Sequence, residues 1–122
     1  MMVISNNMSA QQKTVIDNSK PIVLFVEFEF DTKDMDLAVE LLTEMQNQTI
    51  ENEERCIAYD MLLNVEEPNT IYMYECYENK VALDAHNNAP YFKKIVNDKL
   101  KPIIKAQKIL KLNPINDIGI MM

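Results

Sequence analysis

The sequence predicts an α+β domain in which one layer of helices covers one face of an antiparallel sheet. Three observations lead to this class. Apolar residues alternate with a period of two in residues 22–30, which indicates a strand. Between residues 38 and 45 they recur at helical spacing, which indicates an amphipathic helix. Segments of these two kinds then follow in the order β-α-β-β-α-β, and 122 residues suit one such domain.

The first strand and the first helix occupy residues 22–52. One face of the strand is uniformly apolar, whereas the other carries Val23 and Phe25 beside Glu27 and Glu29, so we expect both faces of the sheet to be covered. Thr32 and Asp34 are candidate N-caps for the helix, which ends near residue 52. Its buried face is predicted to consist of Ala38, Leu41, Leu42 and Met45.

The second half of the predicted domain contains three strands and a broken helix. Strands are expected at residues 55–64 and 70–77, joined by a loop that contains Pro68. Asn79 is a good N-cap for a short helix through His86, and Pro90 suits the first turn of a second helical piece. Pro102 ends or kinks that piece, and a fourth strand is expected at residues 107–112.

This order is the ferredoxin-like split arrangement, in which a single helix layer leaves one sheet face open. Because that open face is largely apolar, we expect a second copy of the same sheet to cover it in a two-fold homodimer. The domain is expected to span residues 21–113, between a flexible arm at 1–20 and a tail at 114–122 that docks on the partner. Met8 is an alternative start.

Composition and charge exclude several classes of partner. The net charge is −7, which disfavours nucleic acid and anionic membranes. No apolar run approaches the ~20 residues of a spanning helix and residues 1–20 lack a signal pattern, so a cytoplasmic protein is expected. A lysine-rich last third forms either a solvated helix face or a surface that steers an anionic ligand; its members are Lys93, Lys94, Lys99, Lys101, Lys105, Lys108 and Lys111.

No metal or redox motif is found in the sequence. Cys56 and Cys76 both fall in predicted strands and are interpreted as buried, reduced thiols. His86 is the single histidine, which rules out a site built from several histidines. We therefore expect neither a metal nor another cofactor.

The stretch Ile71-Tyr72-Met73-Tyr74-Glu75-Cys76-Tyr77-Glu78-Asn79-Lys80-Val81-Ala82-Leu83-Asp84-Ala85-His86 resembles part of a known family. It is similar to the third strand and following helix of antibiotic biosynthesis monooxygenase (ABM) domains, where an aromatic residue, Glu, any residue and Tyr precede Ala-Leu-x-x-His. Residues 52–60 resemble the family's approach to its second strand, without the usual glycine. The resemblance spans about residues 21–113.

The resemblance implies a quinol-monooxygenase-like member of the dimeric α+β barrel superfamily, with a pocket between sheet and helices in each subunit. Such proteins include cofactor-free oxygenases of quinol-like or aromatic polyketide substrates, haem-degrading enzymes, and one branch that isomerises a phosphorylated sugar. The chain has no Trp, and Tyr91 stands where many members have a second His, which argues against haem degradation.

The resemblance and the alternation together define a candidate site. His86 lies on the inner face of its helix and, with Glu75 orienting it, is predicted to act as a general base. Alternation places Tyr77 on the face of Glu75, and Tyr59, Tyr91 and Phe25 are further candidates for substrate binding. Each candidate also has a structural interpretation. His86 is then a buried packing residue, Glu75 forms a salt bridge with a strand neighbour or with Arg55, and the tyrosines pack in the core or the dimer interface. Tyr72 and Tyr74 are expected in the dimer interface.

Three functions follow as hypotheses. The first is a cofactor-independent monooxygenase of a small aromatic or quinol-like substrate, with His-assisted proton abstraction. The second is an isomerase of a small phosphorylated carbonyl compound, in which a lysine holds the phosphate. The third is a non-enzymatic, dimeric ligand-binding module associated with stress.

Overall fold

The computed structural model describes residues 17–116 of the chain. It contains the strands β1 (Ile22–Phe30), β2 (Cys56–Leu63), β3 (Thr70–Tyr77) and β4 (Ile104–Leu112). The helices are α2 (Met35–Asn52), which follows the short 3-10 turn η1 (Thr32–Asp34), then α3 (Lys80–Asn87) and α4 (Pro90–Phe92). α4 continues into a π-helical segment, η2 (Lys93–Leu100), and a 3-10 turn, η3 (Lys101–Ile103).

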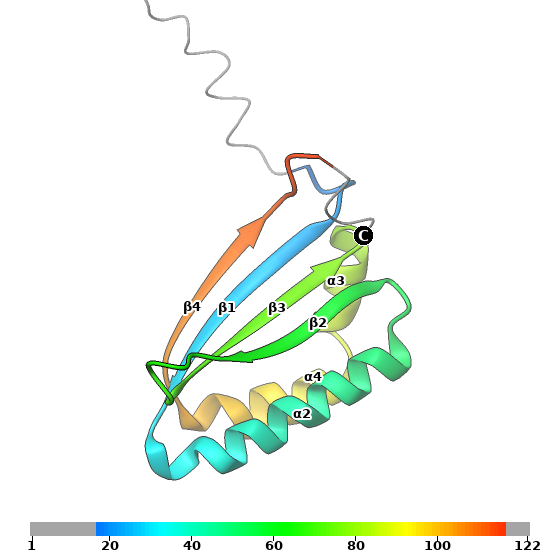
Figure 1. Cartoon of the computed structure of the whole chain (residues 1–122). Helices are drawn as coiled ribbons and strands as arrows, with labels where there is room; N and C mark the ends of the chain where they lie inside the picture. The colour runs from blue at the N-terminus through cyan, green and yellow to red at the C-terminus, as the bar shows by residue number, and fades with distance from the viewer. Residues whose placement is uncertain (1–16, 117–122) are drawn as a thin grey trace, which may run out of the picture.

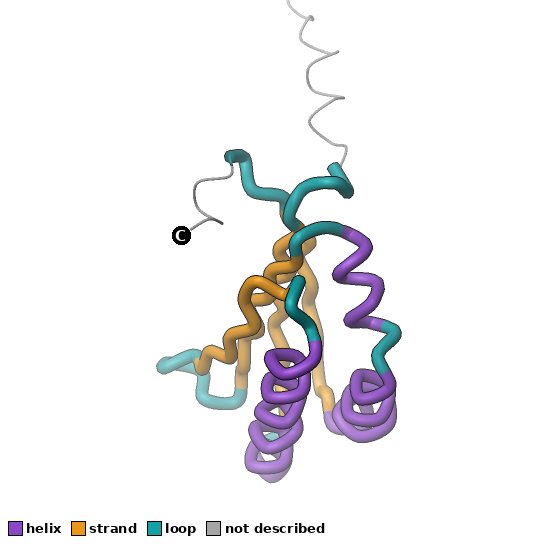
Figure 2. The backbone as a smooth tube through the Cα atoms, turned by 90° about the vertical axis from the view of Figure 1, so that its right-hand side faces the viewer, coloured by secondary structure: helices purple, strands orange, loops and turns teal. Residues whose placement is uncertain are grey.

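The four strands form one antiparallel sheet with the order β2-β3-β1-β4. Both long helical segments, α2 and the one from α4 to η3, lie on the same side of this sheet (Figures 1 and 2). The predicted β-α-β-β-α-β order and the α+β class are confirmed. The β1–β4 register shifts between Glu29 and Phe30, near the start of β4.

The core lies between the sheet and the two helical segments. β1 contributes its even-numbered side chains, as the alternation predicted, and they pack against the predicted face of α2. α2 begins at Met35 with Asp34 as its N-cap residue, although the Asp34 side chain makes no capping hydrogen bond. The helix-facing side of the sheet is therefore the side on which a ligand cavity can form.

Two boundaries differ from the prediction. β4 begins at Ile104, three residues before the expected start, because Pro102 lies inside the short turn η3 and the chain extends directly after it. Residues 17–20 belong to the expected flexible arm, yet the backbone N–H of Lys80 donates to the carbonyl of Asn18 over 3.1 Å. The rest of that arm, 1–16, and the end of the tail, 117–122, lie outside the described residues.

The two ends of the described chain meet beside the last residues of β4. The backbone N–H of Asp17 donates to Oδ1 of Asn113 over 3.0 Å. The amide nitrogen of the same Asn113 side chain donates to the carbonyl of Pro21 over 3.0 Å. A single side chain thus joins the segment that enters β1 to the segment that leaves β4.

The outer face of the sheet, opposite the helices, is aromatic and apolar. Phe25 of β1 stacks on Tyr72 of β3 with ring centroids 5.4 Å apart. On β4, Leu110 is 43% exposed on this face, and Leu112 is similarly exposed. No helix in residues 17–116 combines the length and apolar character needed to cross a membrane.

Candidate active site

A cavity of about 360 Å³ lies between the helix-facing side of the sheet and the helices. Its wall is mainly apolar, and a small number of polar side chains reach into it. This composition is typical of small-molecule sites. The lining residues include Leu24, Tyr59, Glu75, Phe92, Lys101 and Lys111.

The strand register places four of the sheet residues of this cavity in one row. Lys111 of β4 is paired with Leu24 of β1, Leu24 with Glu75 of β3, and Glu75 with Tyr59 of β2. Paired residues on neighbouring strands point to the same face, so all four side chains belong to the helix-facing side. The row gives the cavity floor a carboxyl, a phenol and an ammonium group.

Glu75 is the buried carboxyl of this floor, with only 7% of the residue exposed. Alternation along β3 puts Tyr77 on the same face, and the Tyr77 hydroxyl donates to Glu75 Oε1 over 2.7 Å. Burial raises the pKa of Glu75 to about 7, the negative charge of Glu53 adds to this effect, and the hydrogen bond from Tyr77 opposes it. A carboxyl with this pKa can take or give a proton near neutral pH.

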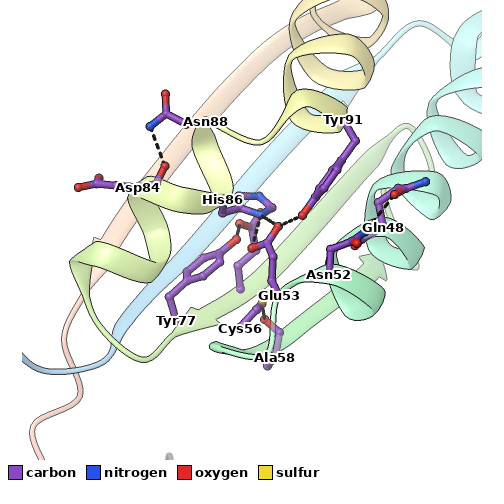
Figure 3. A network of polar contacts seen from close by, with 11 residues as sticks. Gln48, Asn52, Glu53, Cys56, Ala58, Tyr77, Asp84, His86, Asn88 and Tyr91 are labelled. Atoms are coloured by element: carbon purple, nitrogen blue, oxygen red, sulfur yellow. Dashed lines mark hydrogen bonds and ion pairs between the residues drawn. The ribbon is translucent and has the colours of Figure 1, made fainter.

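His86 belongs to a second polar group, which it forms with Glu53 and Tyr91 (Figure 3). Its Nδ1 is 2.9 Å from Glu53 Oε2 and 3.0 Å from Glu53 Oε1. The hydroxyl of Tyr91 donates to the same carboxylate. Glu53 follows the last turn of α2, so this cluster joins the end of α2 to α3 and to the start of α4.

The imidazole of His86 is only 1% exposed. Burial lowers its pKa and outweighs the opposing effect of the Glu53 carboxylate, so the ring is neutral at pH 7. Nδ1–H then donates to Glu53, and Nε2 carries the free electron pair. Within residues 17–116, Nε2 has no hydrogen-bond partner.

Aromatic rings separate His86 from the cavity. Its ring centroid lies 5.4 Å from that of Tyr59 and 5.2 Å from that of Phe92, and both of these residues line the cavity. His86 itself is not one of the lining residues. The side chain predicted to be the base therefore lies one layer behind the cavity wall.

The structure brings most of the predicted site residues together but pairs them differently. The expected contact between Glu75 and His86 is not formed, since Glu75 binds Tyr77 and His86 binds Glu53. The alternative partner of Glu75, Arg55, instead binds the exposed Glu78 at 3.2 Å.

The predicted binding residues are distributed over three places. Tyr59 lines the cavity, and Tyr77 lies beside Glu75. Tyr91 contacts Glu53 rather than the cavity. Phe25 stacks on Tyr72 on the outer face of the sheet, because its position in β1 is odd-numbered, and it does not reach the cavity.

Glu53 was missed by the sequence analysis. It lies 33 residues before His86 in the chain, just beyond the end of α2, where no periodicity marks an inward side chain. The one available signal was its place in residues 52–60, which resemble the approach to the second strand in ABM domains.

The buried phenols and the Cys56 thiol near the cavity are hydrogen-bond donors rather than nucleophiles or metal ligands. Burial raises the pKa of the Tyr59 and Tyr77 phenols, which therefore stay protonated, and it raises the pKa of the Cys56 thiol to about 12. In residues 17–116 no three His, Cys, Asp or Glu side chains are grouped to hold a metal ion.

Several solved structures share this fold. A protein from Caulobacter crescentus named "putative antibiotic biosynthesis monooxygenase" is 18% identical with a TM-score of 0.76, over 81% of this chain and 93% of that one. A Bacteroides thetaiotaomicron protein described as of unknown function, "possible oxidoreductase", is 23% identical with a TM-score of 0.73, over 79% and 99% of the two chains.

A third similar structure, a "putative antibiotic biosynthesis monooxygenase" from Nitrosomonas europaea, is 17% identical with a TM-score of 0.74, over 83% and 96% of the chains. At these identities the similarity concerns the fold. None of the curated proteins matches the sequence.

The family model "Antibiotic biosynthesis monooxygenase" matches residues 21–98, which contain β1 to β3 and every member of the two polar clusters. The chain belongs to the antibiotic biosynthesis monooxygenase family.

Proposed function

We propose that this protein is a cofactor-independent monooxygenase of a small aromatic or quinol-like substrate. One observation carries the proposal: a buried carboxyl with a pKa of about 7, Glu75, lines an apolar cavity of about 360 Å³. Such a cavity is large enough for one aromatic ring. The family assignment supports oxygen chemistry without selecting the substrate.

In the proposed reaction a hydroquinone and O₂ give a hydroxyquinone and water. Glu75 accepts the proton of a phenolic hydroxyl, and the electron-rich phenolate passes electrons to O₂ and forms a carbon–oxygen bond to it. Glu75 returns its proton to the terminal oxygen, and the O–O bond breaks as the ring carbon that bonded O₂ loses its hydrogen as a second proton. One oxygen atom stays on the ring, and the other leaves as water with these two protons. The substrate is the reductant and O₂ the oxidant, so all electrons are accounted for.

The tyrosines position the reacting groups in this scheme. Tyr77 holds one oxygen of Glu75, which leaves the other oxygen for the substrate. Tyr59, protonated at neutral pH, offers a hydroxyl to a substrate oxygen. We assign His86 to the second layer, where its ring packs against Tyr59 and Tyr77 and assists the proton transfer by fixing their orientation.

Oxygen uptake with a panel of substituted hydroquinones tests the proposal. We expect Glu75→Gln to lower kcat/KM by about 10²–10⁴-fold, the usual contribution of a general base. Wild-type kcat/KM should rise with pH through about 7 as Glu75 ionises. Glu78→Gln is the matched control, because Glu78 follows β3 by one residue but is exposed and paired with Arg55.

The other hypotheses predict different outcomes. Conversion of a substrate without oxygen consumption would select the isomerase. Binding without conversion of any compound in the panel would select a non-enzymatic module. Glu75→Gln activity equal to that of the wild type would exclude Glu75 as the base.

We also propose that the partner of the chain is a second copy of itself. The support is the aromatic outer face of the sheet, where Phe25, Tyr72 and Leu110 form a continuous apolar surface across three adjacent strands. An exposed surface of this kind marks an interaction site in soluble proteins.

A further inference from the structure

The cavity carries two lysines that the proposed oxygenation does not use. Lys111 and Lys101 both line it, and Glu75 is its single acidic lining residue. We propose that Lys111 forms an anion subsite, which selects one-ring substrates bearing a carboxylate or phosphate group opposite the hydroxyl that Glu75 deprotonates. This inference rests on the proposed function in one respect only, the role given to Glu75.

The strand register defines the distance between the two charged groups. Lys111 and Glu75 lie in the same row, separated by Leu24 on the central strand β1. Neighbouring strands are about 4.8 Å apart, so the two Cα atoms are separated by about 10 Å across the face of Leu24. One aromatic ring lying over Leu24 can therefore present a hydroxyl to Glu75 and an anionic substituent to Lys111.

The charge balance of the row favours an anionic ligand. Ion pairs occupy two lysines of the described chain, with Lys80 bound to Asp84 and Lys105 near Glu29 and Asp31. Within residues 17–116, Lys111 has no such pair. A ligand anion placed beside Glu75 would oppose its ionisation, whereas one held by Lys111 is neutralised at the far side of the ring.

Lys101 lies too far away to share this subsite. It precedes Ile104, which pairs with Phe30, whereas Lys111 pairs with Leu24, six residues away along β1. At about 3.3 Å per residue Phe30 and Leu24 are about 20 Å apart, so Ile104, close to Lys101 in the chain, lies far from Lys111. Lys101 therefore lies at the opposite end of the cavity from Lys111. Its replacement provides a control for the replacement of Lys111.

The experiment is a calorimetric measurement of binding without oxygen, so that no turnover occurs. The probes are 4-hydroxybenzoate, its neutral analogue 4-hydroxybenzamide, and 4-hydroxyphenyl phosphate. We expect wild-type protein to bind at least one of the two anions about 10-fold more tightly than the amide, and the tighter anion identifies the group. Lys111→Met should abolish this preference without weakening the amide, and Lys111→Arg should restore it.

Two variants serve as controls. Lys108→Met removes a lysine from the same strand, but Lys108 pairs with Glu27 on the outer face, so the preference should remain. Lys101→Met should also leave the preference for these short compounds intact. If Lys108→Met and Lys111→Met lowered the preference for the anions equally, the preference would come from the overall charge of the protein. That result would overturn the subsite.

The inference and the proposed function fail separately. Equal affinity for anions and amide in the wild type, or no binding of any probe, overturns the anion subsite. A preference that depends on Lys111, in a protein that consumes no oxygen with any hydroquinone, keeps the subsite and rejects the monooxygenase.

Discussion

Glu75 and Glu53 are two buried or half-buried carboxyls with different partners. Glu75 is bound by the neutral phenol of Tyr77 and lines the cavity, whereas Glu53 is shared by the Nδ1 of His86 and the hydroxyl of Tyr91. The first is suited to exchanging a proton with a ligand. The second holds a neutral imidazole in one tautomer.

Replacement of Glu75 should change the pH dependence of stability. Its folded pKa of about 7 is above the ordinary 4.5, so its contribution to stability is complete below pH 4.5 and is lost as the pH rises through 7. The loss is about 3 kcal/mol at most. Urea unfolding at pH 4.5 and 8 should show a smaller decrease in the free energy of unfolding for Glu75→Gln than for wild type.

The exposed Glu78→Gln is the control for this measurement and should keep the wild-type decrease. An identical decrease in wild type and Glu75→Gln would show that the folded protein does not raise the pKa of Glu75.

The single histidine allows a direct test of the second cluster. We expect the imidazole proton resonances of His86 to titrate below pH 6.5, because burial lowers the pKa. Glu53→Gln should lower the pKa further, since the carboxylate raises it by charge and by hydrogen bonding. Proton NMR over a pH series measures both values, and titration above 6.5 in the wild type would contradict the assigned neutral ring.

The short helix α3 positions His86. Asn79 is its N-cap, with the side-chain oxygen accepting from the backbone N–H of Ala82 over 3.0 Å, as the sequence predicted. A helix of 8 residues has few internal hydrogen bonds, so its cap and its packing determine its stability.

Removal of this cap should therefore have a measurable cost. Asn79→Ala is expected to lower the free energy of unfolding by about 1 kcal/mol and Tm by about 4–8 °C. Asn79→Ser keeps a capping oxygen and should stay close to wild type in a thermal scan. Equal destabilisation by both substitutions would show that the cap hydrogen bond is not the cause.

The π-helical segment η2 explains another part of the cavity. Lining residues recur from α4 into η3 at Phe92, Val96, Asn97, Leu100 and Lys101. The interval is four residues, from Phe92 through Val96 to Leu100 and from Asn97 to Lys101. This segment thus presents one continuous face to the cavity over its whole length.

The sequence predicted the elements better than the contacts between them. Alternation in β1 and β3 and the spacing in α2 depend on neighbouring residues, so the strand faces, including the opposite sides of Tyr77 and Tyr72, were predicted correctly. The Glu53–His86 contact depends on where the end of α2 lies over the sheet, and no local sequence pattern predicts that position. The π-helix was also unpredicted, because apolar spacing in residues 92–100 is compatible with an ordinary helix.

The outer sheet face is the surface through which we expect two copies of the chain to assemble. The helices cover one side of the sheet (Figure 2). The other side presents the Phe25–Tyr72 stack and the exposed leucines of β4. Covering this face with a second copy would bury these side chains without changing the cavity, which lies on the opposite side.

The oligomeric state tests this arrangement. Sedimentation equilibrium of the wild type should give twice the 14.2 kDa of one chain. Leu110→Glu places a charge on this face, on the edge strand β4 beside Phe25, and should give the single-chain mass. Val65→Glu changes a 93% exposed residue in the β2–β3 loop and should leave the dimer intact. A wild type that sediments as one chain at micromolar concentration would reject the dimer.

The contact of Asp17 with Asn113 has a consequence for engineering. Because these positions touch, a short peptide can join them, and the ends can be reopened elsewhere. The loop between β2 and β3 is mostly exposed, lies at the opposite end of the strands from the Asn113 junction, and does not line the cavity (Figure 1). A circular permutant opened there would keep Lys111, Leu24, Glu75 and Tyr59 in one row, with β4 and β1 consecutive in the new chain.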